Sequence, residues 1–414
     1  MKKRTKIFKS EFYRIRELLS FPKYRFQIIV SIVCIFSVRV IKFLFPVLRC
    51  FDNLYFRHKQ KLLLDRSIQI NKSSRTHKEI LRVATTYQCN VNCSFCYAQC
   101  LREEFKRHMS LDDFEFLVKW AKSQGWKSFR LLGGEPTFHP YFKDILDIAR
   151  RERLTISIST NGLFDREVNT LLNRDLIESI NFSYPQTQRT PEKKDLFCAN
   201  IKNAISKGIP VVGSWIIYFD DEDGWREIVD LAKRYQNKIT LRFSMALPGK
   251  REDLSPADLK QNLRKIVKQI LNISSYCYQN RVLFFFYRPL LLCMFNKSEL
   301  DFLYSISPFL FDSQCACFYV DGNYANLVTI NPDLTCYPCP VVQVKGMKIA
   351  SNTTREDISQ YFKSSVTELS RKPLVDSCAN SDAFNNYKDQ LKNKFRNFFD
   401  KKICQGGCIG YKMY

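Results

Sequence analysis

Histidine and glycine are both scarce in this chain. Four His and 13 Gly among 414 residues argue against a His-rich zinc or mononuclear iron site and against Gly-rich fibrous repeats. No segment repeats at a fixed period, and 45% hydrophobic residues provide ample material for a packed core, which excludes a disordered chain. A chain of this length is expected to form two or three domains.

A long uninterrupted apolar run is also absent. Residues 26–38 form an apolar stretch that ends at Arg39 and Lys42, whereas a membrane span needs about 20 apolar residues. Residues 1–82 hold 20 Lys and Arg against 5 Asp and Glu, a net +15 of the total +24. This pattern favours a helix lying on an anionic membrane surface, with a helix packed against protein or a true span as alternatives.

No small-residue cleavage site follows the apolar run, so a secretory signal is not expected. We therefore predict a cytoplasmic protein that residues 1–80 hold peripherally on the cytoplasmic face of the membrane. Sixteen Cys fit this location, because cytosolic thiols stay reduced and clustered thiolates bind zinc or iron–sulfur clusters.

Short apolar strands alternate with amphipathic helices after residue 80. Six strands are expected at 81–88, 128–132, 154–159, 179–184, 210–218 and 238–245. Helical patterns near 111–124, 140–152, 166–173, 193–207, 224–236 and 256–274 separate or follow them. Six such units predict an α/β fold, a partial (β/α)6 TIM-like barrel at 81–300. It would follow the helical basic segment 1–80 and precede a small Cys-rich α+β domain at 301–414.

Polar motifs follow the first four predicted strands, where sites of parallel α/β folds collect. The first strand is followed by Cys89, Cys93 and Cys96 in a C-x3-C-x2-C pattern. The second leads into Gly133-Gly134-Glu135-Pro136, in which glycines let a ligand approach the backbone and the carboxylate can face an ammonium group. Ser159, Thr160 and Asn161 lie at the end of the third strand, and Ser183 lies at the end of the fourth.

These motifs at consecutive strand ends resemble the radical S-adenosylmethionine (radical SAM) superfamily. The resemblance implies that Cys89, Cys93 and Cys96 hold a [4Fe–4S] cluster with one open iron, which binds S-adenosylmethionine (SAM). It further implies that Gly133, Gly134 and Glu135 contact the amino group of SAM. Its ribose and carboxylate would be contacted by Ser159, Thr160, Asn161 and Ser183. Its adenine would be contacted by the backbone near Phe95 and Tyr97. No catalytic base is identified.

Seven further Cys occur from residue 315 onward. Residues 325–330 and 334–337 are predicted to form a β-hairpin that ends in Cys336-Tyr-Pro-Cys339, with Leu334 where related hairpins carry Gly. The pattern resembles in part the SPASM or twitch domains, which hold auxiliary [4Fe–4S] clusters. The resemblance implies one auxiliary cluster, bound by a subset of Cys315, Cys317, Cys336, Cys339 and Cys408. A second, incompletely ligated cluster at Cys378 and Cys404 and a four-Cys zinc site are the alternatives.

The leading hypothesis is a radical SAM enzyme that abstracts a substrate hydrogen to modify a peptide or protein side chain. The alternative keeps the chemistry and acts on a lipid-linked, sugar or other small molecule at the membrane. Either enzyme needs a one-electron donor such as flavodoxin or ferredoxin. The net charge of +24 would also suit nucleic acid, but no RNA-binding motif accompanies it, so we do not expect that partner.

Overall fold

The computed structural model describes residues 54–56, 58–59, 80–184, 190–218, 223–235, 238–246, 262–288, 290, 294–306, 328–342 and 344–371. The chain divides into two compact units, Met1–Leu63 and Leu64–Tyr414, and the second contains the sheet. Most of the basic N-terminal segment lies outside the described residues, so its contact with a membrane stays a prediction. Within the described ranges, no helix combines the length and the apolar character that crossing a bilayer requires.

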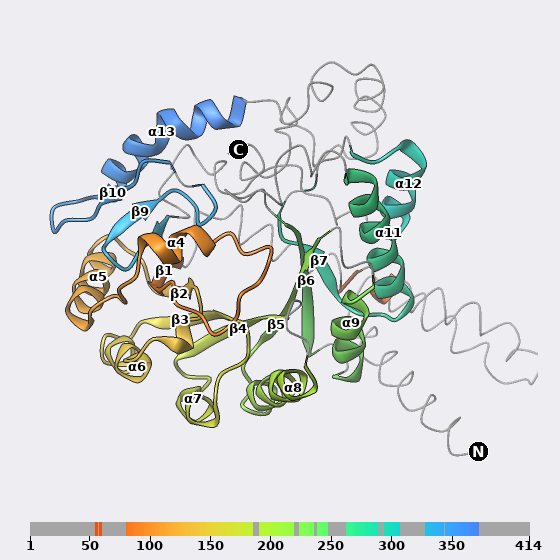
Figure 1. The fold of residues 1–414 in the computed structure, drawn as a ribbon, viewed down its shortest axis with the longest axis horizontal. Coiled ribbons are helices and arrows are strands. Elements are labelled where there is room, and N and C mark those ends of the chain that lie inside the picture. Colours follow the sequence, from red (N-terminus) through yellow and green to blue (C-terminus); the bar gives the residue numbers. More distant parts are fainter. Residues whose placement is uncertain are drawn as a thin grey trace, which may run out of the picture. The chain divides into compact units, whose positions relative to one another are not determined.

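The second unit is built on one ten-stranded sheet with the order β10-β9-β8-β1-β2-β3-β4-β5-β6-β7. Neighbouring strands from β8 through β1 to β7 pair in parallel, whereas β9 and β10 pair antiparallel. The strands are β1 (Ile80–Thr86), β2 (Ser128–Gly133), β3 (Thr155–Thr160), β4 (Ile177–Ser183), β5 (Val211–Ile217), β6 (Ile239–Met245), β7 (Phe284–Phe286), β8 (Thr329–Ile330), β9 (Thr335–Tyr337) and β10 (Met347–Lys348). The predicted partial TIM-like α/β fold is confirmed, with the sheet curved but not closed (Figure 1).

Helices cover the outer side of the curved sheet, where Figure 1 shows α5 to α9 following one another along β1 to β6. The helices are α4 (Gln99–Glu104), α5 (Leu111–Ser123), α6 (Phe142–Arg151), α7 (Arg166–Leu171), α8 (Pro191–Ser206), α9 (Trp225–Arg234), α11 (Leu263–Gln279), α12 (Lys297–Ile306), α13 (Arg355–Arg371) and the short 3-10 helix η1 (Pro136–Phe138). Helix α5 begins where Ser110 Oγ accepts a hydrogen bond from the Asp113 backbone N–H at 3.0 Å. This N-cap satisfies one of the unpaired donors of the first turn.

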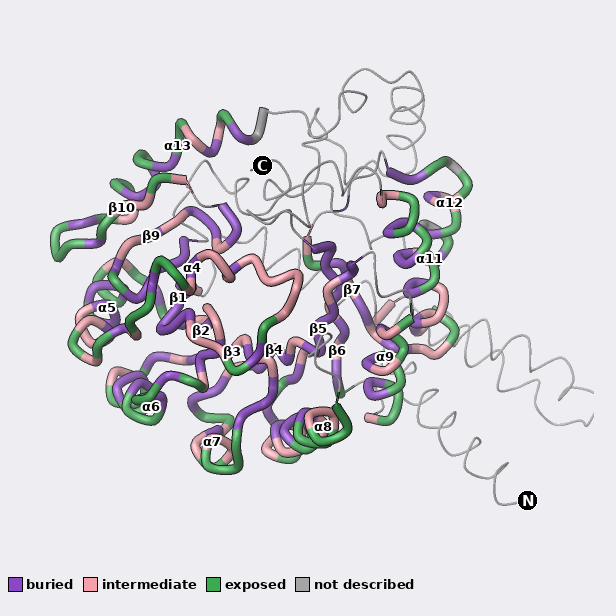
Figure 2. The backbone as a smooth tube through the Cα atoms, in the orientation of Figure 1, coloured by how far each residue is buried: buried purple, intermediate pink, exposed green. Residues whose placement is uncertain are grey.

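The hydrophobic core lies between the sheet and these outer helices (Figure 2). Successive side chains of a strand point to opposite faces, so alternate residues of β2 face the helices. Phe129 and Leu131 are fully buried there, and the Phe129 ring meets the Phe114 ring of α5 edge to face at 5.9 Å. The residue between them, Arg130, is therefore directed to the inner face of the sheet.

The sheet contains a seventh parallel strand that the sequence pattern does not predict. Strand β7 is three residues long and pairs with β6 from Leu241 to Phe243. The sequence Phe284-Phe285-Phe286 is too short to show an alternation of apolar and polar residues. Its pattern therefore cannot distinguish a strand from a loop or a helix turn. Pairing with β6 is what gives it strand geometry, so it could not be identified from local sequence.

The β8–β9 hairpin confirms the predicted pairing after residue 328 and joins the same sheet through β1. Its turn places Leu334 at φ +67°, the left-handed region that glycine adopts most readily. Leu334 keeps its side chain 8% exposed in the core. Burial of the Leu334 side chain thus offsets the strain of a backbone conformation that Gly would adopt without cost.

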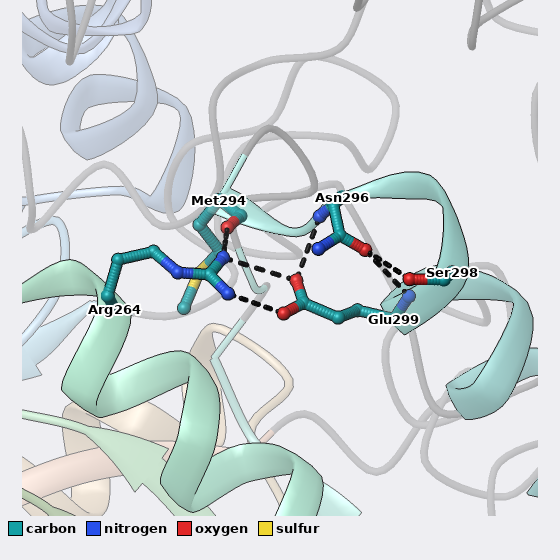
Figure 3. Close-up of polar contacts among 5 residues, drawn as sticks. All are labelled: Arg264, Met294, Asn296, Ser298 and Glu299. Atoms are coloured by element: carbon teal, nitrogen blue, oxygen red, sulfur yellow. Dashed lines mark hydrogen bonds and ion pairs between the residues drawn. The ribbon is translucent and has the colours of Figure 1, made fainter.

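Helix α12 begins with a capping box, and an ion pair with Arg264 joins it to α11 (Figure 3). Asn296 Oδ1 accepts from the Glu299 backbone N–H at 2.9 Å, and Glu299 Oε2 accepts from the Asn296 backbone N–H at 2.9 Å. Arg264 at the start of α11 donates to both Glu299 oxygens, at 2.5 and 3.2 Å, and to the Met294 carbonyl. This contact fixes the segment that leaves β7.

Candidate active site

The three cysteines of the C-x3-C-x2-C pattern lie on the loop between β1 and α4. Cys89, Cys93 and Cys96 are free thiols of intermediate exposure, and the Cys96 N–H donates to the Cys93 carbonyl at 3.2 Å in a tight turn. In the described part of the chain, no three His, Cys, Asp or Glu side chains are already gathered as a metal site. Three half-exposed thiols on one short turn nevertheless form a donor set that suits iron, because metal binding deprotonates and recruits thiols.

Cys89 lies closest to the polar motif that follows β3. Asn161 Nδ2 approaches Cys89 Sγ at 3.7 Å and donates to Asn90 Oδ1 at 2.6 Å. Burial raises the pKa of Cys89, and a backbone hydrogen bond with Val91 lowers it in part. The structure thus brings together two predicted site segments, the loop after β1 and the turn after β3.

Glu135 connects the loops that follow β2 and β3. Its side chain is fully buried, and Oε1 accepts from Thr137 Oγ1 at 2.7 Å and Thr160 Oγ1 at 2.8 Å. Its Oε2 accepts from the Asn161 backbone N–H at 2.6 Å. Burial raises the pKa of Glu135, while these hydrogen bonds lower it. The carboxylate is therefore already engaged in positioning the site, and its contact with a SAM amino group stays a prediction.

Gly133 and Gly134 allow the loops after β1 and β2 to approach closely. A Cβ on Gly133, at φ +131°, would lie 2.2 Å from the Thr86 carbonyl oxygen, and one on Gly134 would lie 2.2 Å from that of Gln88. The Gly134 and Glu135 backbone N–H groups donate to Thr86 and Gln88, both at 2.9 Å. The sequence analysis attributed the glycines to ligand approach; the structure shows that the chain's own backbone already requires them.

The other predicted SAM contacts lie along the same edge of the sheet. Phe95 reaches across to Tyr218 after β5, with ring centroids 6.2 Å apart. Ser159 and Ser183 are partly exposed at the ends of β3 and β4, whereas Tyr97 packs against the core. The Cys loop therefore spans from β1 toward β5, and the residues predicted to contact SAM border it on the side of β2 to β4.

The C-terminal hairpin lies next to the Cys loop. Tyr87, just before Cys89, donates from Oη to Asn331 Oδ1 in the hairpin turn at 2.7 Å. Cys336 and Cys339 are buried free thiols, and burial raises the pKa of Cys336 to about 12. The predicted partners Cys315, Cys317 and Cys408 lie outside the described residues, so the auxiliary cluster stays a prediction.

Tyr97 connects the two Cys-bearing segments. Burial raises its pKa well above the usual value, and the Cys96 and Cys339 thiols add to this increase. Arg288 and Arg82 oppose this increase. Charged or ionisable groups of the Cys loop, the hairpin and two further segments thus all affect the pKa of Tyr97.

Four arginines next to this site were missed by the sequence analysis. They lie on or beside three strands and β7, and they are Arg82, Arg130, Arg242 and Arg288. A signal was present, because the first three each interrupt an apolar strand at a position flanked by buried neighbours. Charged residues in such places are rare unless paired or functional.

Comparisons with known proteins agree with this geometry. Residues 83–249 match the model of the Radical SAM superfamily. The chain is 30% identical over 157 residues, 35% of its length, to a probable GTP 3',8-cyclase of Methanothermobacter marburgensis. It is 29% identical over 143 residues, 34% of its length, to an Fe-coproporphyrin III synthase of Methanosarcina barkeri. It spans 50% and 35% of these two relatives.

A solved structure, native anSMEcpe with bound AdoMet, shares the fold. Its TM-score is 0.54 at 17% sequence identity, and the match covers 80% of this chain and 88% of that one. Radical SAM proteins use a [4Fe–4S] cluster and SAM, which fits the donor set of the loop after β1. Residues 83–249 of the chain therefore form a domain of the radical SAM superfamily.

Proposed function

We propose that this enzyme modifies a peptide or protein side chain by hydrogen abstraction. The observation that carries the radical chemistry is the half-exposed Cys89, Cys93 and Cys96 loop, held against the Glu135 network at the strand ends. Support for a peptide comes from the shared fold: one matched structure is anSMEcpe with bound AdoMet and Cp18Cys peptide, at a TM-score of 0.52 and 16% identity.

In this proposal Cys89, Cys93 and Cys96 bind three irons of a [4Fe–4S] cluster and leave one iron for SAM. The cluster and SAM, when bound, supply one-electron cleavage of the sulfonium and hence the 5′-deoxyadenosyl radical that takes the substrate hydrogen. The protein's part is positioning: Glu135 holds the Thr160 and Asn161 turn. Phe95 and Tyr218 contribute aromatic surface that keeps water from the reacting groups.

Cys336 and Cys339 are proposed ligands of an auxiliary cluster, together with a subset of Cys315, Cys317 and Cys408. The supporting contact is the hydrogen bond from Tyr87 Oη to Asn331 Oδ1, which joins the hairpin to the segment just before Cys89. A cluster at the hairpin would thus lie near the radical site and could accept the electron left after hydrogen abstraction. A flavodoxin or ferredoxin is the proposed electron donor.

A small-molecule substrate is the second candidate. The two curated relatives are named for GTP and for Fe-coproporphyrin III, and both compounds carry anionic groups. The four arginines near the Cys loop would suit such a substrate. The membrane version of this candidate depends on residues 1–80 and awaits a binding test.

The test is SAM cleavage by the anaerobically reconstituted full chain with dithionite as reductant. 5′-Deoxyadenosine would be measured with synthetic peptides encoded beside the gene, with GTP, and with neither. We expect 5′-deoxyadenosine together with a mass change of a peptide. Cys96→Ala should abolish both, whereas Cys198→Ala, a half-buried thiol of α8, should retain both. No 5′-deoxyadenosine from the wild type would contradict the radical chemistry, and a mass change of GTP alone would contradict the peptide substrate.

A further inference from the structure

Four arginines converge on the inner face of the curved sheet. Arg82 and Arg130 are direct partners on β1 and β2, and Arg242 lies on β6 next to Phe285 of β7. The neighbours of Arg130 and Arg242 along their strands are fully buried against the helices, so both arginines are directed inward. Arg288 follows β7 and donates to the Met245 carbonyl at 2.9 Å.

Tyr287 contacts arginines from β1 and β6, two strands that four other strands separate in the sheet order. Arg82 Nη2 donates to Tyr287 Oη at 3.1 Å, and the Arg242 guanidinium lies over the Tyr287 ring at 4.5 Å from its centroid. Sheet curvature therefore brings β1 and the end of β7 together at this phenol. Arg130 is close enough that both Tyr287 and Arg82 affect its pKa, which burial lowers.

Three of the four arginines have no carboxylate partner among the residues that the structure describes. In the described part of the chain, no Asp or Glu oxygen lies within 4.0 Å of a nitrogen of Arg130, Arg242 or Arg288. Glu178 is near enough to raise the pKa of Arg130, though without forming an ion pair with it. Burial lowers the pKa of Arg242 to about 10, and Arg130, Arg288 and Arg82 lower it further while Tyr287 raises it.

Like charges in a protein interior are costly unless an anion compensates them. Guanidinium groups keep their charge, so these arginines cannot escape the cost by losing a proton. Arg130 and Arg242 also keep part of their surface accessible, so a ligand from solvent can reach them.

A buried donor next to Arg242 also lacks an acceptor. Arg242 Nε donates to Ser214 Oγ at 2.7 Å, and Ser214 Oγ donates to Asn181 Oδ1 at 2.5 Å. The Asn181 Nδ2 amide is buried and has no hydrogen-bond partner within the described residues. Buried hydrogen-bond donors are normally satisfied. The Asn181 amide and the guanidinium groups are all donors, so the same ligand atom, an oxygen acceptor, would suit them.

We propose that the inner face of the sheet binds an anionic group of the substrate, a carboxylate or a phosphate, between Arg130 and Arg242, with Arg82, Arg288 and the Asn181 amide beside it. Guanidinium forks bind both anions through paired hydrogen bonds. The Cys loop follows the end of β1, which carries Arg82, and Arg288 contacts Met245 at the end of β6, so the bound anion would hold the substrate near the radical site. The assignment rests on the proposed function in that the anion belongs to the molecule being modified.

The test measures binding of two probes, inorganic pyrophosphate and a hexaglutamate peptide, to the reconstituted full chain by calorimetry. Arg130→Gln should weaken binding about tenfold or more, because a charge-assisted contact is lost. Arg150→Gln should not change it, since Arg150 is an exposed residue of α6 paired with Asp147. Tighter pyrophosphate binding identifies phosphate as the source, and tighter hexaglutamate binding identifies carboxylate.

Thermal unfolding of the Arg130→Gln variant shows whether a loss of binding comes from misfolding. Without ligand, Arg130→Gln should unfold at a temperature no lower than the wild type, because a buried cation without an ion-pair partner is removed. Arg130→Lys, which keeps the charge and loses the fork, should bind with intermediate affinity. Binding of neither probe by the wild type, or equal binding by Arg130→Gln, would overturn the proposal.

5′-Deoxyadenosine measured in the same wild-type preparation separates this proposal from the proposed function. SAM cleavage without probe binding would overturn the anion site alone. Probe binding without SAM cleavage would overturn the radical function alone.

Discussion

A single buried carboxylate, Glu135, connects the loops that follow β1, β2 and β3. Its backbone N–H donates to Gln88 beside Cys89, and its side chain accepts from Thr160 and Asn161. Asn161 in turn approaches Cys89 Sγ. The Cys loop is thus positioned by residues of two other loops before any cofactor binds, which reduces the ordering that binding requires.

His139, four residues after Glu135, makes the stability of the site depend on pH. It is 3% exposed; Nε2 contacts the Met109 carbonyl at 2.9 Å and Nδ1 accepts from the Tyr141 N–H at 3.1 Å, which fixes the neutral form. Burial lowers its pKa from 6.5 to about 4. The unfolded chain therefore binds the proton more readily, and stability is lost as pH falls below 6.5.

We predict that His139 alone lowers the free energy of unfolding by about 2 kcal/mol between pH 7 and pH 5. His139→Gln should remove that part of the pH dependence, although the pKa of His108, also lowered by burial, leaves a smaller part. Urea unfolding of the cluster-free protein at both pH values measures this. An identical pH dependence in the wild type and His139→Gln would refute the prediction.

At the level of elements, the close approach of the loops after β1 and β2 makes Gly134 irreplaceable. An alanine Cβ there would meet the backbone oxygens of Gln88 and Tyr87 at 2.2 and 2.3 Å, and backbone cannot move as a side chain can. We expect Gly134→Ala to destabilise the protein by about 3 kcal/mol or more and to reduce iron incorporation at the Cys loop.

Gly208→Ala is the matched control for that substitution. Gly208 has φ +70° and open space around it, so an alanine there costs only backbone strain of about 1–2 kcal/mol. It should leave iron content unchanged. Equal loss of stability and of iron in both variants, measured by thermal unfolding and iron analysis, would show that the close approach does not matter.

The six longer strands could be predicted because each shows buried apolar positions at alternate residues. Strand β7 could not, because three phenylalanines carry no period and become a strand only by pairing with β6. The site motifs at Cys89, Glu135 and Asn161 were readable from their place after strands. The role of Glu135 as a buried hydrogen-bond acceptor could not be predicted from the sequence, because it depends on donors at the end of β3.

At the level of the whole second unit, the C-terminal strands extend the barrel sheet. Strand β8 pairs with β1, and Trp120 Nε1 of α5 donates to the Thr353 carbonyl before α13 at 2.8 Å. The Arg355 guanidinium lies over the Trp126 ring at 4.6 Å. The described part of the predicted 301–414 domain is therefore packed on the radical SAM domain.

The arginine cluster also depends on the arrangement of the whole second unit. Arg82 and Arg242 are 160 positions apart in the sequence, and only the curvature that brings β1 to the end of β7 places both at Tyr287. Each arginine alone is an isolated charge in an apolar strand. Their convergence could not be predicted from the local pattern because it depends on how far the sheet curves.

The central claim is that Cys89, Cys93 and Cys96 hold the cluster that cleaves SAM. The most direct measurement is iron per chain and 5′-deoxyadenosine in the anaerobically reconstituted Cys89→Ala/Cys93→Ala/Cys96→Ala variant beside the wild type. The account predicts about four fewer irons per chain and no 5′-deoxyadenosine in the variant. Unchanged iron content, or continued SAM cleavage, would contradict it.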